Sequence, residues 1–212
     1  HPGMGRSLSD RFPESRQVFD AADEALDESL STICFEGTDE QLALTENTQP
    51  AILTVSIAAL RALEKRGIRP SAAAGHSLGE YSAHVAAGTF DFEDAVRTVR
   101  RRGRLMQEAV PVGEGAMAAI LGMTPHEVEK ICRESADGQV VSPANFNGPG
   151  QIVIAGHAEA VERAMGAAQE AGAKRCVRLP VSAPFHCSLM EPAARGLEPI
   201  LAGLDMRDPG IP

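Results

Sequence analysis

The chain has 212 residues, of which 43% are hydrophobic, and its formal net charge at pH 7 is −9. This length and composition predict a folded protein with one domain, or one domain with a small insert. The negative charge argues against nucleic acid as a general partner, and no apolar run approaches the roughly 20 residues that a membrane span needs. The four cysteines, Cys34, Cys132, Cys176 and Cys187, lack metal-ligand spacing and predict reduced thiols in a cytoplasmic protein.

The first third of the chain is predicted to be mainly helical. Apolar residues recur at helical spacing over residues 10–34, and a short helix can form over residues 38–44. Asn47 or Thr48 can cap a further helix. Pro50 then fits its first turn, because proline lacks the N–H that the first turn leaves unused.

A Gly-x-Ser-x-Gly pattern centred on Ser77 follows a short apolar run at residues 72–74 and precedes a helix-like segment at residues 80–87. Alanine favours helix, but Pro70 and Gly75 around the apolar run favour a strand there. A serine on a tight strand-to-helix turn holds its hydroxyl clear of the backbone, and the helix after it directs free N–H groups at the same place. The pattern indicates either a nucleophile beside an oxyanion site or an ordinary glycine-lined loop.

Residues 91–109 are predicted to form a helix with acidic residues in its first turn, as the helix dipole favours. Four arginines share one face of this helix and form either a solvated surface or a docking face: Arg97, Arg100, Arg101 and Arg104. Arg102 instead falls on the apolar side. A buried guanidinium needs a partner, so Arg102 indicates either a structural ion pair or a clamp for a substrate carboxylate.

Residues 113–181 are predicted to form a separate unit with the order strand, helix, strand, strand, helix, strand. Its first helix begins with Thr124-Pro125-His126-Glu127, a capping box with proline at the first helical position. This order is typical of the ferredoxin-like split βαβ unit. We therefore expect a small subdomain at 113–181, inserted into a larger one made of residues 1–112 and 182–212.

The segment after this insert carries His186, which follows a proline-containing bend and precedes a helix predicted over residues 188–201. A single histidine at such a place is either a satisfied structural residue or a general base.

Four segments, taken together and in order, closely resemble the malonyl-CoA:acyl carrier protein transacylases, the acyltransferases of bacterial fatty acid synthesis that also occur as domains of polyketide synthases. They are Gly75-His76-Ser77-Leu78-Gly79-Glu80-Tyr81, Arg102-Gly103-Arg104-Leu105-Met106-Gln107, Asn145-Phe146-Asn147-Gly148-Pro149-Gly150-Gln151 and Pro184-Phe185-His186. The resemblance covers essentially the whole chain. It implies an α/β fold, in which an α/β-hydrolase-like large subdomain carries an inserted ferredoxin-like (βαββαβ) small subdomain. Family members extend further at both ends, so we expect this chain to be part of a longer protein.

The resemblance also implies roles for individual residues. Ser77 corresponds to the acylated nucleophile, and His186 to its general base and later general acid. Arg102 corresponds to the arginine that holds the malonyl carboxylate, and the backbone N–H of Leu78 to one oxyanion donor.

Two further residues have a functional and a structural interpretation each. Gln49 corresponds to a glutamine of the site, or is a capping or hydrogen-bonding residue beside Pro50. Phe185, next to His186, disfavours larger 2-substituted malonyl groups, or serves only for packing.

The activity that the resemblance implies is transfer of a malonyl group from coenzyme A to the phosphopantetheine thiol of acyl carrier protein, through a malonyl-serine intermediate. Malonyl-CoA and the carrier protein are the expected partners, and no metal or redox cofactor is expected. We further expect a cytoplasmic monomer that binds neither nucleic acid nor membrane. The alternatives are a serine esterase or thioesterase of the α/β-hydrolase type, and an inactive fragment that still binds the carrier protein.

Overall fold

The structure, a computed structural model, describes residues 1–212 and contains ten α-helices, one 3₁₀ helix and four β-strands. It divides into two compact units, which we call unit 1 (His1–Arg104 and Leu197–Pro212) and unit 2 (Leu105–Gly196). The mixture of helices and strands confirms the α/β class. These units reflect how the residues pack, and they do not test where one subdomain is inserted into another. The subdomain boundaries at 112/113 and 181/182 therefore stay a prediction.

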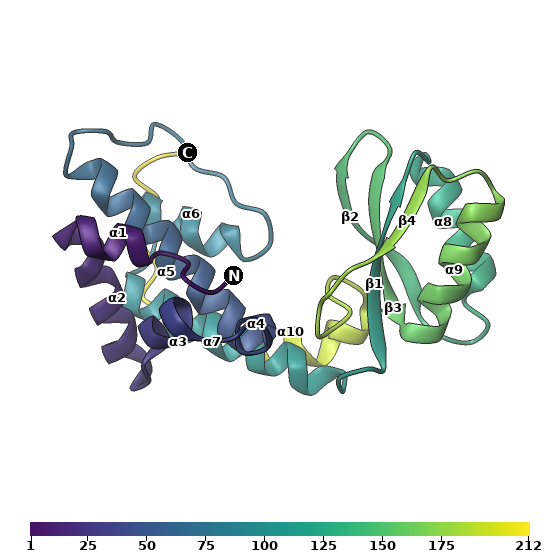
Figure 1. Ribbon diagram of the computed structural model, residues 1–212, viewed down its shortest axis with the longest axis horizontal. Helices are drawn as coiled ribbons and strands as arrows, with labels where there is room; N and C mark the ends of the chain where they lie inside the picture. Colours follow the sequence, from purple (N-terminus) through teal and green to yellow (C-terminus); the bar gives the residue numbers. More distant parts are fainter. The chain divides into compact units, whose positions relative to one another are not determined.

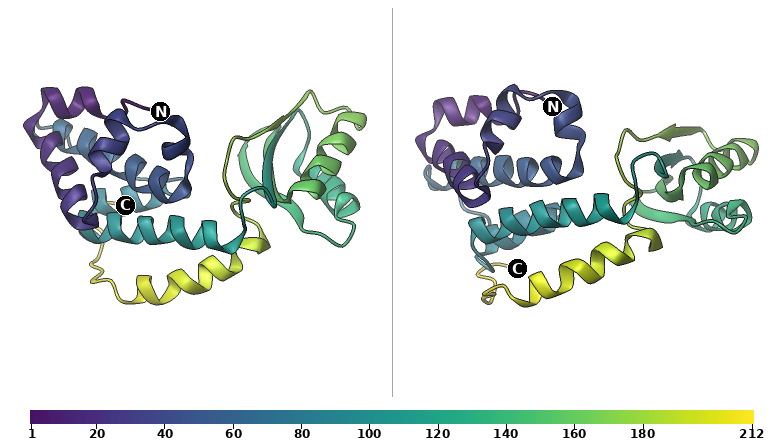
Figure 2. Two further views of the ribbon diagram at one scale, coloured as in Figure 1. Left: turned by 60° about the horizontal axis from the view of Figure 1, so that its bottom comes forward. Right: turned by 90° about the horizontal axis from the view of Figure 1, so that it is seen from below.

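Unit 1 is built from helices (Figure 2). They are α1 (Arg6–Arg11), α2 (Pro13–Leu26), α3 (Leu30–Glu36), α4 (Asp39–Ala43), α5 (Thr45–Glu64), α6 (Gly79–Ala87), the part of α7 (Phe92–Ala109) up to residue 104 and the part of α10 (Glu191–Ala202) from residue 197. The core contains Phe19 from α2, Leu53 and Ile57 from α5, and Val96 and Val99 from α7, each at most 1% exposed. Each pair from one helix is three or four residues apart, so one face of the helix enters the core.

The helix predicted over residues 10–34 is interrupted. α2 ends at Leu26, Asp27 has a left-handed backbone with φ 50°, and α3 begins at Leu30. Aspartate tolerates this conformation better than most residues because its short side chain can bond locally to the backbone. The short helix predicted at 38–44 is confirmed as α4, which begins with a capping box at Thr38.

α5 begins earlier than predicted, at Thr45, so Pro50 lies inside the helix and not in its first turn. The proposed caps are therefore wrong. Asn47 Nδ2 instead donates to the carbonyl oxygen of Gln41 at 2.9 Å, and the Thr48 hydroxyl donates to the carbonyl oxygens of Leu42 and Leu44. Both side chains thus tie α5 back to the α4 segment.

The strand predicted at residues 72–74 is also wrong, because this segment has no regular structure. A strand needs a neighbour to pair with its alternate N–H and C=O groups, and all four strands formed by residues 1–212 lie in unit 2. The Ala73 N–H donates instead to the carbonyl oxygen of Pro212 at 2.8 Å.

Unit 2 contains a four-stranded antiparallel sheet with the order β2-β3-β1-β4. Along the chain its elements are β1 (Gly115–Leu121), α8 (Pro125–Ser135), β2 (Val141–Gly148), β3 (Gln151–His157), α9 (Ala158–Glu170) and β4 (Arg175–Arg178). Both helices lie against one face of the sheet (Figure 1). The element order and the strand order confirm the predicted split βαβ unit. The capping box of Thr124 and Glu127 at the start of α8 is confirmed too.

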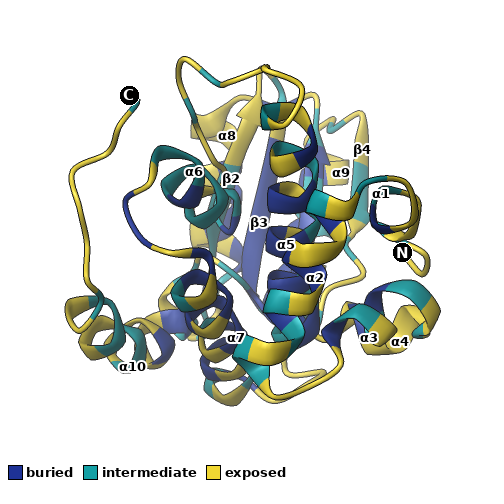
Figure 3. Cartoon of the chain, turned by 90° about the vertical axis from the view of Figure 1, so that its left-hand side faces the viewer, coloured by how far each residue is buried: buried dark blue, intermediate teal, exposed yellow.

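The two faces of the sheet have different partners. On β1, Ala116, Ala118 and Ile120 join the core with α8 and α9, while Met117 packs with apolar residues on the other face. This alternation is that expected of a strand covered on both sides, and β3 is buried along most of its length (Figure 3). Phe185 and Cys187 pack against the face opposite the two helices. The segment that carries His186 therefore lies on that face.

The helix predicted over 188–201 consists of η1 (Ser188–Met190) and α10 (Glu191–Ala202), with Pro199 inside α10. No helix of the structure combines the length and the apolar character needed to cross a membrane.

Candidate active site

Ser77 lies in the turn directly before α6 and has a left-handed backbone with φ 53°. Only three other non-glycine residues have positive φ: Asp27, Asp137 and His186. Aspartate and histidine adopt this conformation more readily than serine does, so the conformation of Ser77 is imposed by its surroundings. Both residues predicted to be catalytic thus have an uncommon backbone conformation.

Gly75 explains how the turn before α6 can be so tight. A Cβ atom at this position would lie 2.0 Å from the carbonyl carbon of Gly79 and 2.1 Å from the backbone nitrogen of Glu80. The same addition at Gly79 meets nothing within 4 Å. The first glycine of the motif is therefore required by the turn itself, whereas the second is not required for packing within the chain.

The N-terminus of α6 adjoins Ser77. The N–H groups of residues 79–81 donate to the carbonyl oxygens of residues 76–78, and that of Leu78 is not among these donors. The N-terminus is also the positive end of the helix dipole, which favours an anion beside it. Leu78 has a buried side chain. Its role as an oxyanion donor stays a prediction.

Arg102 reaches from α7 to the serine. Its Nη2 donates to Ser77 Oγ at 3.1 Å, and its Nη1 donates to Gln49 Oε1 at 2.6 Å. The guanidinium carbon lies 5.7 Å from the centre of the Tyr81 ring, within the range of cation–π attraction. The structure thus brings together three of the predicted site residues, Ser77, Arg102 and Gln49.

These contacts of Arg102 are all with uncharged groups. Burial lowers the pKa of Arg102, while Tyr81 and Glu80 oppose this with smaller effects, and no carboxylate among residues 1–212 forms an ion pair with it. The structural ion pair considered for Arg102 is therefore wrong. Arginine keeps its proton under such conditions. A partly buried cation with only neutral partners would be stabilised by an anion.

The other arginines of α7 differ from Arg102. Arg100 is only 5% exposed, with an ion pair to Glu28 at 2.9 Å and a hydrogen bond to Asn47. Arg97 and Arg104 form ion pairs with acidic side chains at 2.7–3.0 Å. The prediction of a solvated or docking face is therefore wrong for Arg100, and the charges of Arg97 and Arg104 are matched within unit 1.

His186 and Phe185 belong to unit 2. The exposed His186 has φ 62° and follows the buried Pro184. Pro184 occupies the space where Gly115 lacks a side chain, since a Cβ there would lie 2.4 Å from its ring. Phe185 packs against Met117, Val153 and Ala155, as its packing interpretation requires. That His186 is the general base of Ser77 stays a prediction, as does a selectivity role of Phe185.

Sequence reasoning missed two residues beside the predicted ones. Tyr81 is the single tyrosine of the chain, and its ring faces the Arg102 guanidinium. Thr45 Oγ1 accepts a hydrogen bond from Gln49 Nε2 at 3.0 Å. Thr45 and Gln49 are four residues apart, which is the spacing of neighbours on one helix face. That spacing was the available signal for Thr45.

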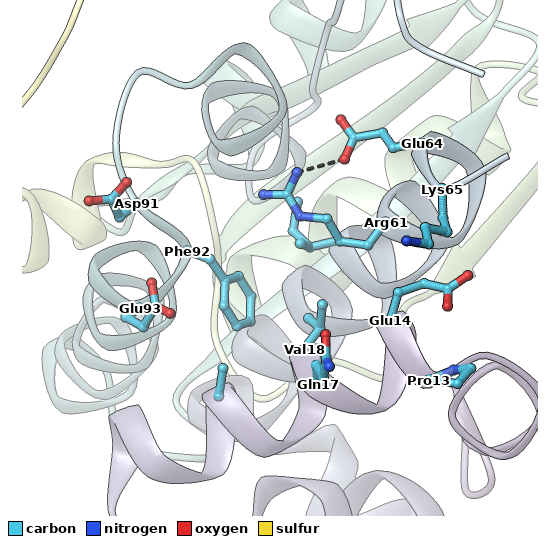
Figure 4. A pocket seen from close by; sticks show the side chains of 12 residues that line it. Pro13, Glu14, Gln17, Val18, Arg61, Glu64, Lys65, Asp91, Phe92 and Glu93 are labelled. Carbon is cyan, nitrogen blue, oxygen red and sulfur yellow. Dashed lines mark hydrogen bonds and ion pairs between the residues drawn. The ribbon is translucent and has the colours of Figure 1, made fainter. Parts of the chain in front are cut away.

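A separate groove of about 710 Å³ in unit 1 contains none of the predicted site residues. Six of the 12 residues that line it are charged, including Glu14, Lys65 and Asp91, and Arg61 donates to Glu64 at 2.7 Å (Figure 4). It has no part in the arrangement around Ser77.

A comparison with known families decides the assignment. The sequence matches the acyl transferase domain over residues 1–212. The chain belongs to the acyl transferase family. It is 52% identical over 211 residues to the malonyl CoA-acyl carrier protein transacylase of Bacillus subtilis, covering 99% of this chain and 67% of that protein. The transacylase of Escherichia coli K12 is also 52% identical, with 99% and 68% covered.

Solved structures of acyl transferases agree with this assignment. The malonyl CoA-acyl carrier protein transacylase of Coxiella burnetii matches with a TM-score of 0.97 and 48% identity, over 100% of this chain and 67% of that one. A malonyl-transacylase in complex with its type II PKS acyl-carrier protein matches with a TM-score of 0.96 and 49% identity, over 100% and 69%. The chain thus spans about two thirds of the length of these relatives.

Proposed function

We propose that this acyl transferase moves a malonyl group from coenzyme A to the phosphopantetheine thiol of an acyl carrier protein, in fatty acid biosynthesis. The observation that carries the proposal is the Arg102 guanidinium, which lies 3.1 Å from Ser77 Oγ and has only uncharged partners. When its thioester lies at the serine, an acyl group that ends in a carboxylate places a negative charge beside the Arg102 guanidinium. A planar guanidinium can hold such a carboxylate with two parallel hydrogen bonds.

The reaction proceeds in two transfers. His186 takes the proton of the Ser77 hydroxyl while Oγ attacks the thioester carbonyl carbon, and collapse of the tetrahedral intermediate releases coenzyme A as its thiol. The carrier thiol then attacks the malonyl-serine ester, losing its proton to His186, and Ser77 leaves with a proton. No electron is gained or lost, so the scheme itself calls for no redox cofactor.

The oxyanion of each tetrahedral intermediate is stabilised by backbone N–H groups. We assign one of these to Leu78, at the N-terminus of α6. Gln49 contributes to carboxylate binding through Arg102, because its Oε1 accepts a hydrogen bond from the guanidinium.

The acyl carrier protein is the proposed partner, in line with the relative that was solved with its carrier protein. We retain a cytoplasmic monomer as part of the proposal. The four cysteines are free thiols in the structure, which supports a reducing compartment.

The test is the intact mass of the full-length protein after mixing with malonyl-CoA. We expect one malonyl group per chain, its loss on addition of carrier protein, and no labelling of Ser77→Ala. Labelling that persists in Ser77→Ala would refute the nucleophile. Release of free malonate without any transfer to the carrier would favour the serine hydrolase alternative, and stoichiometric carrier binding without acyl-serine would favour the inactive binding fragment.

A further inference from the structure

We infer that Thr45 is a positioning residue for the carboxylate clamp. Its hydroxyl orients the side-chain amide of Gln49, and this amide holds the Arg102 guanidinium beside Ser77. The inference rests on the proposed function, because it explains how that site keeps its selectivity for an acyl group with a carboxylate.

The direction of the Gln49 amide follows from the chemistry of its neighbours. Arginine offers only donors, so the atom that meets Arg102 Nη1 at 2.6 Å is the amide oxygen. The amide NH₂ therefore faces the other way, where Thr45 Oγ1 accepts from it at 3.0 Å. A flipped amide would place its NH₂ against the guanidinium, donor against donor. Arg102 thus selects this orientation of the amide, and the Thr45 hydroxyl, which accepts from the NH₂, holds the amide at its other end.

Burial strengthens this preference. Thr45 and Gln49 are each 5% exposed, so little water is available to replace either bond. A buried donor left without an acceptor is destabilising, which disfavours any alternative position of the amide. Because both ends of the amide are engaged within the chain, Gln49 acts on a substrate through Arg102.

The packing of α7 on α5 keeps the three side chains close. Gly103 is the neighbour of Arg102, and a Cβ atom there would lie 2.5 Å from the Cα of Glu46 and 2.7 Å from the carbonyl oxygen of Thr45. α7 therefore touches the first turn of α5 directly. Thr45 and Gln49 lie four residues apart along that end of α5, as neighbours on one helix face.

The experiment compares variants of the full-length protein by the first-turnover rates of Ser77 acylation with malonyl-CoA and with acetyl-CoA. Thr45→Val removes the acceptor with little change of shape, and Thr45→Ser keeps it. Thr54→Val is the matched control, since Thr54 is a fully buried threonine of the same helix whose hydroxyl has no hydrogen-bond partner.

We expect Thr45→Val to lower the ratio of malonyl to acetyl loading about tenfold, while Thr45→Ser and Thr54→Val stay within about twofold of wild type. Wild-type selectivity in Thr45→Val would overturn the inference. So would an equal loss in Thr45→Val and Thr54→Val, because it would reflect packing alone.

A second comparison decides the matter even where Thr45→Val folds poorly. Gln49→Leu removes the amide, and adding Thr45→Val to it leaves no unpaired amide donor, so the double variant avoids that source of instability. We expect the second substitution to change the ratio no further. Another tenfold fall would show that Thr45 acts independently of Gln49 and would refute the inference. If the proposed function is wrong, neither malonyl-CoA nor acetyl-CoA will acylate the wild-type protein. That result would refute the inference together with the proposed function.

Discussion

Arg102 is the residue whose surroundings say most about the chemistry. Its position on the apolar side of α7 could be predicted, because 100° per residue separates it from the neighbouring arginines. Its partners could not be predicted from that helix, because Gln49 and Tyr81 come from α5 and α6. Only the fold shows that these partners are uncharged, and this excludes the ion pair that the sequence left open.

Gly75 gives a test at the same scale. We predict that Gly75→Ala lowers the free energy of unfolding by about 1–3 kcal/mol, because the new methyl group overlaps the backbone at the start of α6. Gly79→Ala is the control, since its methyl group meets nothing within 4 Å. Urea denaturation measures both variants, and equal stabilities would show that the turn has room for a side chain at position 75.

The elements of unit 2 could be predicted closely because their signals are local. The capping box at Thr124 marks the start of α8, and the alternation along β1 matches a strand covered on both faces. β2 and β3 form a hairpin, and β1 pairs with β3 on one side and with β4 on the other.

The elements of unit 1 were harder to predict because their limits depend on neighbours. A break at Asp27 leaves the apolar periodicity intact, so the sequence does not reveal it. The early start of α5 follows from contacts of Asn47 and Thr48 with the α4 segment. Residues 72–74 find no strand to pair with among residues 1–212. The flanking Pro70 and Gly75 favour a strand locally but carry no information about a pairing partner.

At the scale of the molecule, the buried thiols link stability to alkaline pH. Burial raises the pKa of Cys34 in unit 1 from 9.0 to about 11, and that of Cys132 in unit 2 to about 12. The unfolded chain releases these protons near pH 9, whereas the folded chain retains them. The protonated thiols therefore make their full contribution to the free energy of unfolding below pH 9. This contribution is lost as the pH rises toward 11 for Cys34 and toward 12 for Cys132.

We predict that the free energy of unfolding falls between pH 9 and 11, and that Cys34→Ala reduces the slope. Urea denaturation at a series of pH values gives this slope directly. The more exposed Cys176→Ala is the control and is expected to change the slope less. An identical slope in wild type and Cys34→Ala would show that this thiol titrates alike in both states.

The central claim is that Arg102 holds the carboxylate of the acyl group at Ser77, and substitution of this arginine tests it most directly. The measurement is kcat/KM of Arg102→Ala for malonyl-CoA and for acetyl-CoA, with Arg97→Ala as a control from the same helix that lacks contact with the serine. We predict a fall of about 10- to 100-fold for malonyl transfer, as expected for loss of charged hydrogen bonds, and a much smaller fall for acetyl transfer. Equal losses with the two thioesters would contradict the claim and leave Arg102 a structural residue.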